Sequence, residues 1–338
     1  MTPDRRQWSG GARLFAAVRR ALTRTAIRAS LVAAIVGIAS FFVTQALPGD
    51  AAYRIAAGRY GYDLVDTAAA AAVRQELGLD RPATVRLVAW LADLSRGRLG
   101  VSMVSGEPVW TELSHQLGHT VLLAVTAWLL ALGIGAIVGV VTALLNRPWI
   151  DRIAAAGAAM LRATPAFVLG LALALVFAVR AGWLPAAGHG EPAHLVLPAV
   201  TLALGLAAGL SQVVALSVRD VLRSAYVVFA RTKGIGPRAV VVEHVVRNAA
   251  VPIVAYGGAQ LVLLIEGVVV VETFFAWPGI GHALVHAVVA RDVPMIQGAA
   301  LCMGLLFVVL NALVDAACEL LDPRMRRGAS TPTVAAVA

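Results

Sequence analysis

Few residues of this chain have both the type and the spacing that chemistry requires. Its long apolar segments contain no HExxH pattern, no serine accompanied by a histidine and no pair of aspartates, and Glu266 is their single charged residue. The GxxxxGK[ST] loop that cradles nucleotide phosphates is also missing from the chain. The sequence therefore predicts no catalytic residue, no bound cofactor and no metal site, and a membrane enzyme such as an intramembrane hydrolase is the weaker hypothesis.

Glu266 is the most prominent single candidate for a functional side chain. A carboxylate within a membrane segment costs about 2.5–3.5 kcal/mol on insertion scales and normally faces a cavity or a partner. We expect Glu266 either to line a cavity, where it meets a substrate amine, or to lie protonated or paired at an interface with a second membrane subunit. Three neutral residues are further candidates for a polar pathway, although hydrogen bonding between helices explains them equally well: Gln212, Gln260 and Asn311.

A pair of histidines raises the question of a metal. His282 and His286 are four residues apart, so on a helix they would share one face, as metal ligands do. No cysteine or carboxylate cluster completes a site around them. We therefore expect the pair to be incidental, and transport of a metal ion stays an alternative.

One basic segment, residues 226–252, separates two long apolar runs and contains Lys233, the only lysine of the chain. Residues 226–233 have the length of about two helical turns, and Gly234 suits the left-handed position that ends a helix. Pro237 prevents simple continuation, and Ala239–Asn248 is predicted to form a second helix. A short helix tied to two membrane spans can convert a push from a soluble partner into helix movement. A solvated loop with the basic residues of a cytoplasmic segment is the alternative.

Composition places the chain in a membrane. Hydrophobic residues make up 59% of its 338 residues, charged residues only 14%, and the mean hydropathy is +0.81. Six runs are long enough to span a bilayer, which takes roughly 17–25 residues, and their continuous apolar character indicates helices rather than barrel strands. We predict an all-α integral membrane protein with six transmembrane helices: Ala29–Leu47, Thr120–Leu145, Ala163–Val179, Leu195–Val218, Ala249–Val271 and Val293–Val314.

The distribution of basic residues predicts the topology. Most arginines outside the long first loop fall in segments that are cytoplasmic if the N-terminus is inside. The predicted organisation is a cytoplasmic basic N-terminus (1–28), a retained first span (29–47), an extracytoplasmic loop (48–119), a core of five spans (120–319) with a cytoplasmic loop (226–248), and a cytoplasmic tail (320–338). The first apolar run is longer than the ~7–15 residues of a signal peptide, so we expect it to be an anchor. The net charge of +9 fits this bias and attraction to anionic lipid, so no nucleic acid partner is expected.

Smaller patterns predict local structure on either side of the membrane. Asp66–Gly78 is expected to form a helix capped by Asp66 and stopped at Gly78, followed by a second helix over Arg81–Leu94. The WPGIG sequence at Trp277–Gly281 predicts a turn in the third outer segment. Two small-xxx-small pairs, Gly135/Gly139 and Gly205/Gly209, would allow close approach of helix backbones.

Ten short sequences, in order along the chain, together resemble those of permease subunits of the dipeptide/oligopeptide/nickel family of bacterial ABC importers. The resemblance covers roughly residues 28–327. Its cytoplasmic part consists of ARTKGIG at Ala230–Gly236 and HVVRNAAVP at His244–Pro252. The other eight are LPGD (Leu47–Asp50), ELGLDRP (Glu76–Pro82), GRLGVSM (Gly97–Met103), GWLPAAG (Gly182–Gly188), HLVLP (His194–Pro198), VVVETFFAWPGIG (Val269–Gly281), RDVP (Arg291–Pro294) and LLDPR (Leu320–Arg324).

The resemblance implies a type I ABC importer permease fold in a bacterial inner membrane, with both termini cytoplasmic. It implies that the fourth to sixth spans line half of a path for peptides and that a paralogous permease supplies the other half. Two ATPase subunits, which hold ATP and magnesium, would dock on a coupling helix formed by Phe229, Ala230, Arg231, Thr232, Lys233, Gly234 and Ile235. An extracytoplasmic binding protein would dock on the outer loops, including Trp277, Pro278 and Gly279.

The chain departs from the family pattern at two points. Near the end of the fourth span, where the family often has basic residues, this chain has Gln212 and Ala215, and Glu266 stands where a small residue is expected. The Glu-Ala-Ala that gives the family loop its name is Val228-Phe229-Ala230 here, which is usual for this branch of the family and does not count against the match. The charge of the cavity, and with it the substrate, is left open by these differences. Nickel, glutathione and haem-type cargoes are alternatives to peptides, and a self-contained secondary transporter is disfavoured because six spans resemble half of a pathway.

Overall fold

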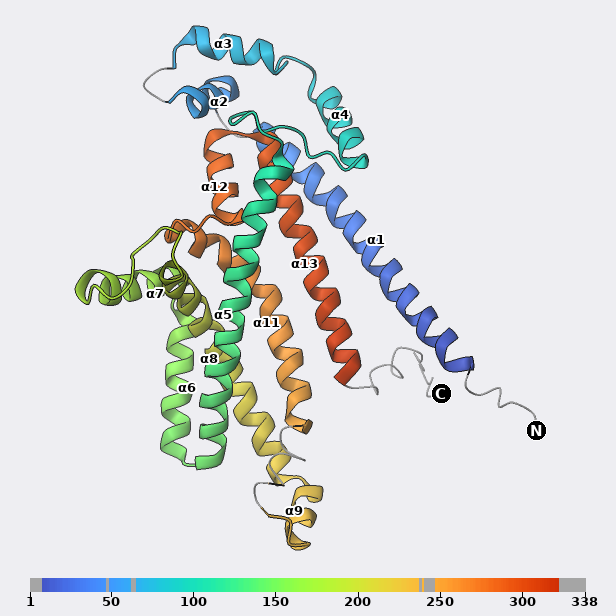
Figure 1. Cartoon of the computed structure of the whole chain (residues 1–338), viewed down its shortest axis with the longest axis vertical. Helices are drawn as coiled ribbons and strands as arrows, with labels where there is room; N and C mark the ends of the chain where they lie inside the picture. The colour runs from blue at the N-terminus through green and yellow to red at the C-terminus, as the bar shows by residue number, and fades with distance from the viewer. Residues whose placement is uncertain (1–7, 47–48, 62–64, 237–238, 240–246, 322–338) are drawn as a thin grey trace, which may run out of the picture. The chain divides into compact units, whose positions relative to one another are not determined.

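The regular elements of the protein are helices, as the computed structural model in Figure 1 shows for residues 8–46, 49–61, 65–236, 239 and 247–321. The N-terminal helices are α1 (Trp8–Ala46), α2 (Ala51–Tyr60), α3 (Thr67–Glu76), α4 (Ala83–Ser95) and α5 (Val109–Leu145). Next come α6 (Pro148–Ala163), α7 (Ala166–Leu173), the π-helix η2 (Ala174–Arg180), α8 (Ala193–Arg223) and α9 (Ala225–Thr232). The chain continues with α11 (Arg247–Phe274), α12 (Ile280–Ala290) and α13 (Val293–Leu321).

The all-helical membrane fold predicted from the sequence is confirmed. Within the described ranges, five helices are long and apolar enough to cross a membrane, and a sixth crossing is present if the bent pair α6 and α7–η2 counts as one span. Most of the predicted helix Ala239–Asn248 and nearly all of the tail at 320–338 lie outside the described residues. The chain divides into two compact units: unit 1 comprises Met1–Leu122 and Ala276–Val309, and unit 2 comprises Leu123–Phe275 and Leu310–Ala338.

Close contact between α5 and α8 in unit 2 depends on small residues. A Cβ atom at Gly139 would lie 2.6 Å from the carbonyl oxygen of Ser211, and one at Gly135 would lie 2.9 Å from the side chain of Leu210. Nothing larger than glycine therefore fits at these two positions without displacement of α8. The predicted role of the Gly135/Gly139 pair in helix packing is confirmed.

The third predicted span, Ala163–Val179, needs a correction to its boundaries. Helix α6 begins at Pro148 and ends at Ala163, and α7 leaves it at an angle of 104° (Figure 1). Thr164 and Pro165 both have extended backbone conformations at the break. The cause is local, because proline has no N–H to donate and forces the residue before it out of the helical region.

The first loop of unit 1, which was predicted to be extracytoplasmic, is folded into three short helices. Asp66 accepts a hydrogen bond of 2.7 Å from the backbone N–H of Ala69 at the start of α3, and Gly78 has a left-handed φ of +57° just after the end of that helix. Both the cap and the stop were predicted. Helix α2 was not predicted; it is capped in the same way by Asp50, whose carboxylate accepts from the N–H of Ala52 at 2.9 Å.

A compact apolar core holds unit 1 together. Val109 and Leu113 at the start of α5 are fully buried against Ile280 of α12 and Ala299 of α13. A Cβ at Gly298 of α13 would lie 2.6 Å from the side chain of Val109, which shows how closely the two helices approach. Segments nearly two hundred residues apart in sequence thus share one core.

Candidate functional site

The first four residues of the predicted coupling helix, Phe229 to Thr232, lie in helix α9, which begins earlier, at Ala225, and follows directly from the long helix α8. Lys233, Gly234 and Ile235 lie beyond the end of α9. Ser224 ends α8 in an extended conformation, and its carbonyl oxygen accepts hydrogen bonds of 3.1 Å from the N–H groups of Val227 and Val228. Its hydroxyl donates to the carbonyl oxygen of Val221 at 2.6 Å. The single residue Ser224 therefore turns the chain sharply and starts α9 without a flexible linker.

Helix α9 has one buried face and one exposed apolar face. Val227 and Ala230 are buried and pack against Val221 and Ile235. On the other side, the Phe229 side chain is 59% exposed, and those of Tyr226 and Val228 are exposed as well. A short helix that is anchored on one side and offers aromatic and aliphatic side chains on the other is suited to bind a partner protein.

The end of α9 is fixed by the residues that the sequence singled out. Gly234 has φ +81°, and the N–H of Ile235 donates to the carbonyl oxygen of Ala230 at 3.2 Å, which closes the helix. The Lys233 ammonium lies 4.6 Å from the centroid of the Phe229 ring. The prediction of a helix ended by a left-handed glycine at 234 is confirmed, whereas the side chain of Arg231 lies outside the described parts.

An ion pair connects the helix before α9 to the neighbouring helical hairpin. Arg219, near the end of α8, donates from Nη2 to the carboxylate of Asp151 in the first turn of α6 and, at 3.0 Å, to the carbonyl oxygen of Thr142 near the end of α5. Movement of α9 would therefore reach α5 and α6 through α8. Sequence analysis did not detect this contact, because Arg219 is one of several basic residues in a segment expected to be cytoplasmic.

The candidate pathway residues lie on three helices, α8, α11 and α13. The Gln260 amide and the Tyr256 hydroxyl, both on α11, lie against Gly209 of α8. The hydroxyl is so close that a Cβ atom at Gly209 would collide with it. Gln212 follows one turn later on α8 and is half-buried, and Asn311 is half-buried on α13. The side chain of Glu266 lies outside the described parts of α11, so its two alternative roles stay open.

The WPGIG segment is largely buried in unit 1. Trp277 is only 5% exposed, and its indole N–H donates to the carbonyl oxygen of His119 at 3.1 Å. Pro278 is half-buried and Gly279, which is buried, is the N-cap of α12. The ring of Trp277 thus stabilises the connection between α5 and α12. Docking of a binding protein on Trp277, Pro278 and Gly279 stays a prediction.

The histidine pair does not form a metal centre by itself. The rings of His282 and His286 are 4.4 Å apart on α12. Burial, together with the neighbouring imidazole, lowers the pKa of His282. No group of three or more histidine, cysteine, aspartate or glutamate side chains suited to a metal ion exists among the described residues.

Comparison with known proteins decides the family. The model of the family described as the binding-protein-dependent transport system inner membrane component matches residues 135–327, which include α9 and most of unit 2. The chain belongs to this family. It is a permease, a multi-pass inner-membrane component of ABC transport systems, and the resemblance drawn from its ten short sequences is confirmed.

Several curated relatives match this permease over nearly their whole length. A glutathione transport system permease protein of Pectobacterium atrosepticum is 39% identical and is matched over 86% of this chain and 94% of the relative. A putative peptide transport system permease protein of Brucella abortus is 37% identical with the same two coverages. A probable peptide ABC transporter permease protein of Sinorhizobium fredii is 36% identical over 90% of this chain and 98% of the relative. A chain of an amino acid ABC transporter crystallised with histidines has a TM-score of 0.44 and 17% identity, and covers 63% of this chain and 94% of that one.

The permease also contains a buried polar network that sequence analysis missed. Asp292, between α12 and α13, is 3% exposed, and its carboxylate accepts from the Ser102 hydroxyl and from the N–H groups of Met103 at 3.1 Å and Met295 at 3.3 Å. It thereby caps α13 and holds the loop that carries GRLGVSM. The sequence showed both short motifs, GRLGVSM and RDVP, without any sign that they meet.

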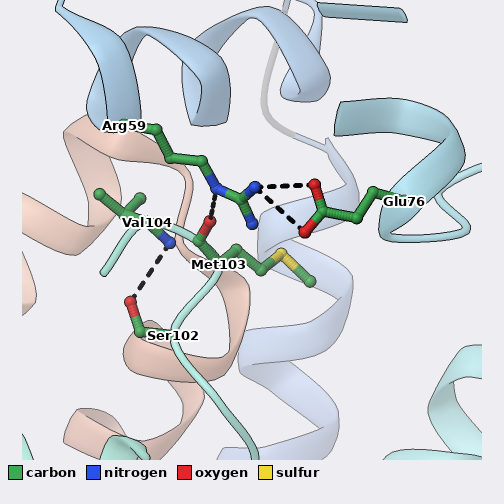
Figure 2. A network of polar contacts seen from close by, with 5 residues as sticks. All are labelled: Arg59, Glu76, Ser102, Met103 and Val104. Atoms are coloured by element: carbon green, nitrogen blue, oxygen red, sulfur yellow. Dashed lines mark hydrogen bonds and ion pairs between the residues drawn. The ribbon is translucent and has the colours of Figure 1, made fainter. Parts of the chain in front are cut away.

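Arg59 of α2 extends this network to α3 (Figure 2). Its Nε donates to the carbonyl oxygen of Met103 at 2.6 Å, and its Nη1 donates to both carboxylate oxygens of Glu76 at 3.1 and 2.9 Å. Figure 2 also shows the N–H of Val104 directed at the hydroxyl oxygen of Ser102, 3.3 Å away. We call α2, α3, the loop at 97–108 and Asp292 the outer cap.

Two further contacts join the outer cap to the preceding LPGD segment. Arg291 has a left-handed φ of +57° and donates from Nη1 to the carbonyl oxygen of Gly49 at 2.9 Å. Arg74 donates to the Asp50 carboxylate at 2.6 Å. Burial alone would raise the pKa of Asp50, but the hydrogen bonds from Arg74 and from the N–H of Ala52 outweigh it and hold the pKa below its usual value of 3.8.

Proposed function

We propose that this permease is the transmembrane subunit of an ATP-driven importer for di- or oligopeptides. It forms half of the translocation path, and a second, paralogous permease forms the other half. Two ATPase subunits hold the ATP and magnesium and hydrolyse the nucleotide, while this chain carries no catalytic group. An extracytoplasmic binding protein delivers the peptide.

The exposed apolar face of α9 carries this proposal. Its buried side is packed within the chain, so it is rigidly joined to α8, and its outer side offers Tyr226, Val228 and Phe229 to a partner. When the ATPases close around ATP, they push α9, and α8 carries the movement to α6 through Arg219 and Asp151. The path then opens outward to accept peptide, and hydrolysis resets it inward.

The topology that follows places both termini and α9 in the cytoplasm and the outer cap on the opposite side of the membrane. Basic residues concentrated in the segments on the α9 side support this orientation. The binding protein contacts the outer cap. Pro278 is a candidate contact within the WPGIG segment, with Trp277 as a buried support.

The substrate class rests on the relatives. Those from Brucella abortus and Sinorhizobium fredii are named for peptide transport. Glutathione, itself a tripeptide, is the second candidate, because a permease named for glutathione transport is 39% identical to this chain. Nickel and haem-type cargoes gain no support from the residues of this chain.

Purification of the tagged permease from its native membrane tests the assembly. We expect it to bring with it a second permease and two ATPase subunits, and proteoliposomes of this complex to take up dipeptide when ATP and the binding protein are present. A permease that purifies alone and transports without ATP would be a secondary transporter and would refute the proposal. Competition by glutathione, measured in the same vesicles, separates the two candidate substrates.

A further inference from the structure

Unit 2 contains a pocket of about 240 Å³ at the break between α6 and α7. Its walls come from the end of α6, from α7, and from the facing parts of α8 and α11, and half of the lining residues are leucines. Gly205 of α8 and Gly267 of α11 also line it, and a Cβ at Gly205 would meet no heavy atom within 4 Å. The pocket therefore has an apolar wall and open space beside Gly205.

Arg162 is the only charged residue among those that line the pocket. It lies in the last turn of α6, and its exposed side chain makes no hydrogen bond or ion pair with any residue that the structure describes. Arg162 directly precedes the predicted span Ala163–Val179, but α6 carries it about 21 Å, or 14 residues of helical rise, beyond Pro148. An arginine this far along a membrane-associated helix calls for an anionic partner.

The polar groups near Arg162 define what that partner must offer. The hydroxyl of Thr164 donates to the carbonyl oxygen of Met160 at 2.8 Å, and the hydroxyl of Thr201 donates to that of Leu197 at 2.7 Å. With their hydrogens used in this way, both hydroxyl oxygens can only accept further hydrogen bonds. The pocket thus combines a cation with N–H donors, two acceptors, and an apolar wall.

We propose that this pocket is a substrate subsite that holds the carboxylate end of a short peptide. Arg162 binds the carboxylate through its planar pair of N–H groups, the threonine oxygens accept peptide N–H groups, and the leucines surround an apolar side chain. This inference rests on the proposed function of peptide import. The phosphodiester of phosphatidylglycerol would satisfy Arg162, but this lipid carries no N–H donor for Thr164 and Thr201, so the peptide matches the pocket better.

A cysteine in place of Gly205 reports on the pocket directly. Position 205 has room for the thiol, and Cys302 and Cys318, both on α13, would be replaced by alanine to leave one reactive site. In proteoliposomes of the complete importer, a small thiol reagent should label the G205C variant, and the dipeptide leucyl-leucine should protect it from labelling. The C-terminal amide of this dipeptide should protect only at concentrations about tenfold higher or more, the scale of one hydrogen bond to a charged group.

Substitution of Arg162 in the G205C background separates the subsite from a structural arginine. R162Q should raise the half-protecting concentration of leucyl-leucine at least about tenfold and leave that of the amide unchanged. R152Q is the matched control, because Arg152 is exposed on the same helix but does not line the pocket; it should change neither value. R162K, which keeps the charge but loses the planar fork, should give an intermediate value.

Four results would overturn the inference: no labelling of the G205C variant, equal protection by the acid and the amide, no effect of R162Q, or protection that depends on phosphatidylglycerol in the vesicles and not on peptide.

The same preparation tests the proposed function independently. If the unsubstituted importer shows no ATP-dependent uptake of leucyl-leucine, peptide import is wrong. If it takes up the dipeptide but the thiol of G205C stays unprotected, only the subsite is wrong.

Discussion

Gly234 shows how a single backbone conformation sets the geometry of the coupling segment. With φ +81° it ends α9, and nothing lies within 4 Å of the position where a Cβ would stand. Strain from an added side chain would therefore come from the backbone alone. The sequence predicted this residue because a glycine after a short helical run, followed by a proline, is a well-understood stop signal.

Replacement of Gly234 by alanine is expected to reduce coupling between hydrolysis and transport. A left-handed alanine costs about 1–2 kcal/mol, so the end of α9 would shift to relieve the strain. Peptide uptake per ATP hydrolysed, measured in proteoliposomes of the complete importer, should fall several-fold. G236A is the matched control, since Gly236 also has open space but no positive φ. If G234A and G236A transport equally well, the conformation of Gly234 has no part in coupling.

Sequence analysis could not predict the hydrogen-bond partners of Asp292, for a physical reason. A buried carboxylate needs donors, and here they are the hydroxyl of Ser102 and backbone N–H groups almost two hundred residues away. Backbone donors have no sequence signature, so nothing in RDVP indicates where Asp292 finds its partners. Trp277 is a similar case, because an aromatic residue in a turn looks the same in sequence whether its ring is buried or exposed.

The D292N variant should destabilise unit 1. It removes the charge from a carboxylate that accepts several hydrogen bonds, each worth about 1.5–3 kcal/mol when the acceptor is charged, so we expect a loss of about 2 kcal/mol or more. S102A, which removes a single donor, should cost less. Thermal unfolding of the purified permease, followed in detergent, checks this order, and a D292N melting temperature equal to that of the unsubstituted protein would contradict it.

At the scale of elements, the sequence predicted how helices pack better than it predicted where a helix breaks. The Gly135/Gly139 spacing predicted a close approach, and α8 lies against it. The break between α6 and α7 was missed because Pro165 stands within an otherwise uninterrupted apolar run. Hydropathy shows that such a run is apolar but not whether the helix axis changes direction within it. Proline in a membrane helix is compatible with a mild kink as well as with the observed 104° turn, so sequence alone could not decide between them.

Two glycines of α5 provide a matched test of that packing. In G139A the new methyl group would collide with the backbone of α8 at Ser211, and we expect a destabilisation of about 1–3 kcal/mol. Gly133 has no heavy atom within 4 Å of its Cβ position, so G133A should be neutral or stabilise the helix by up to about 1 kcal/mol. Thermal unfolding of both variants measures the difference. Equal effects would mean that α5 and α8 do not approach as closely as described.

At the scale of the whole molecule, the coupling helix α9 and the outer cap were identified in different ways. Family resemblance and turn chemistry together identified α9 and assigned it a partner. In unit 1, four short sequences of the resemblance, LPGD, ELGLDRP, GRLGVSM and RDVP, meet in one folded region. Their order along the chain was visible, but their meeting depends on long-range hydrogen bonds that only the three-dimensional structure reveals.

The central claim is that α9 is the docking element for the ATPase subunits, and one measurement tests it most directly. Phe229→Asp places a charge in the exposed apolar face without disturbing a buried contact, since the side chain is 59% exposed. Val85→Asp is the control, because Val85 is similarly accessible but lies on α4, in the predicted extracytoplasmic loop. When each tagged variant is purified with its complex, V85D should retain both ATPase subunits, and F229D should lose them while keeping the second permease. Retention of the ATPases by F229D at the level of the control would contradict the account.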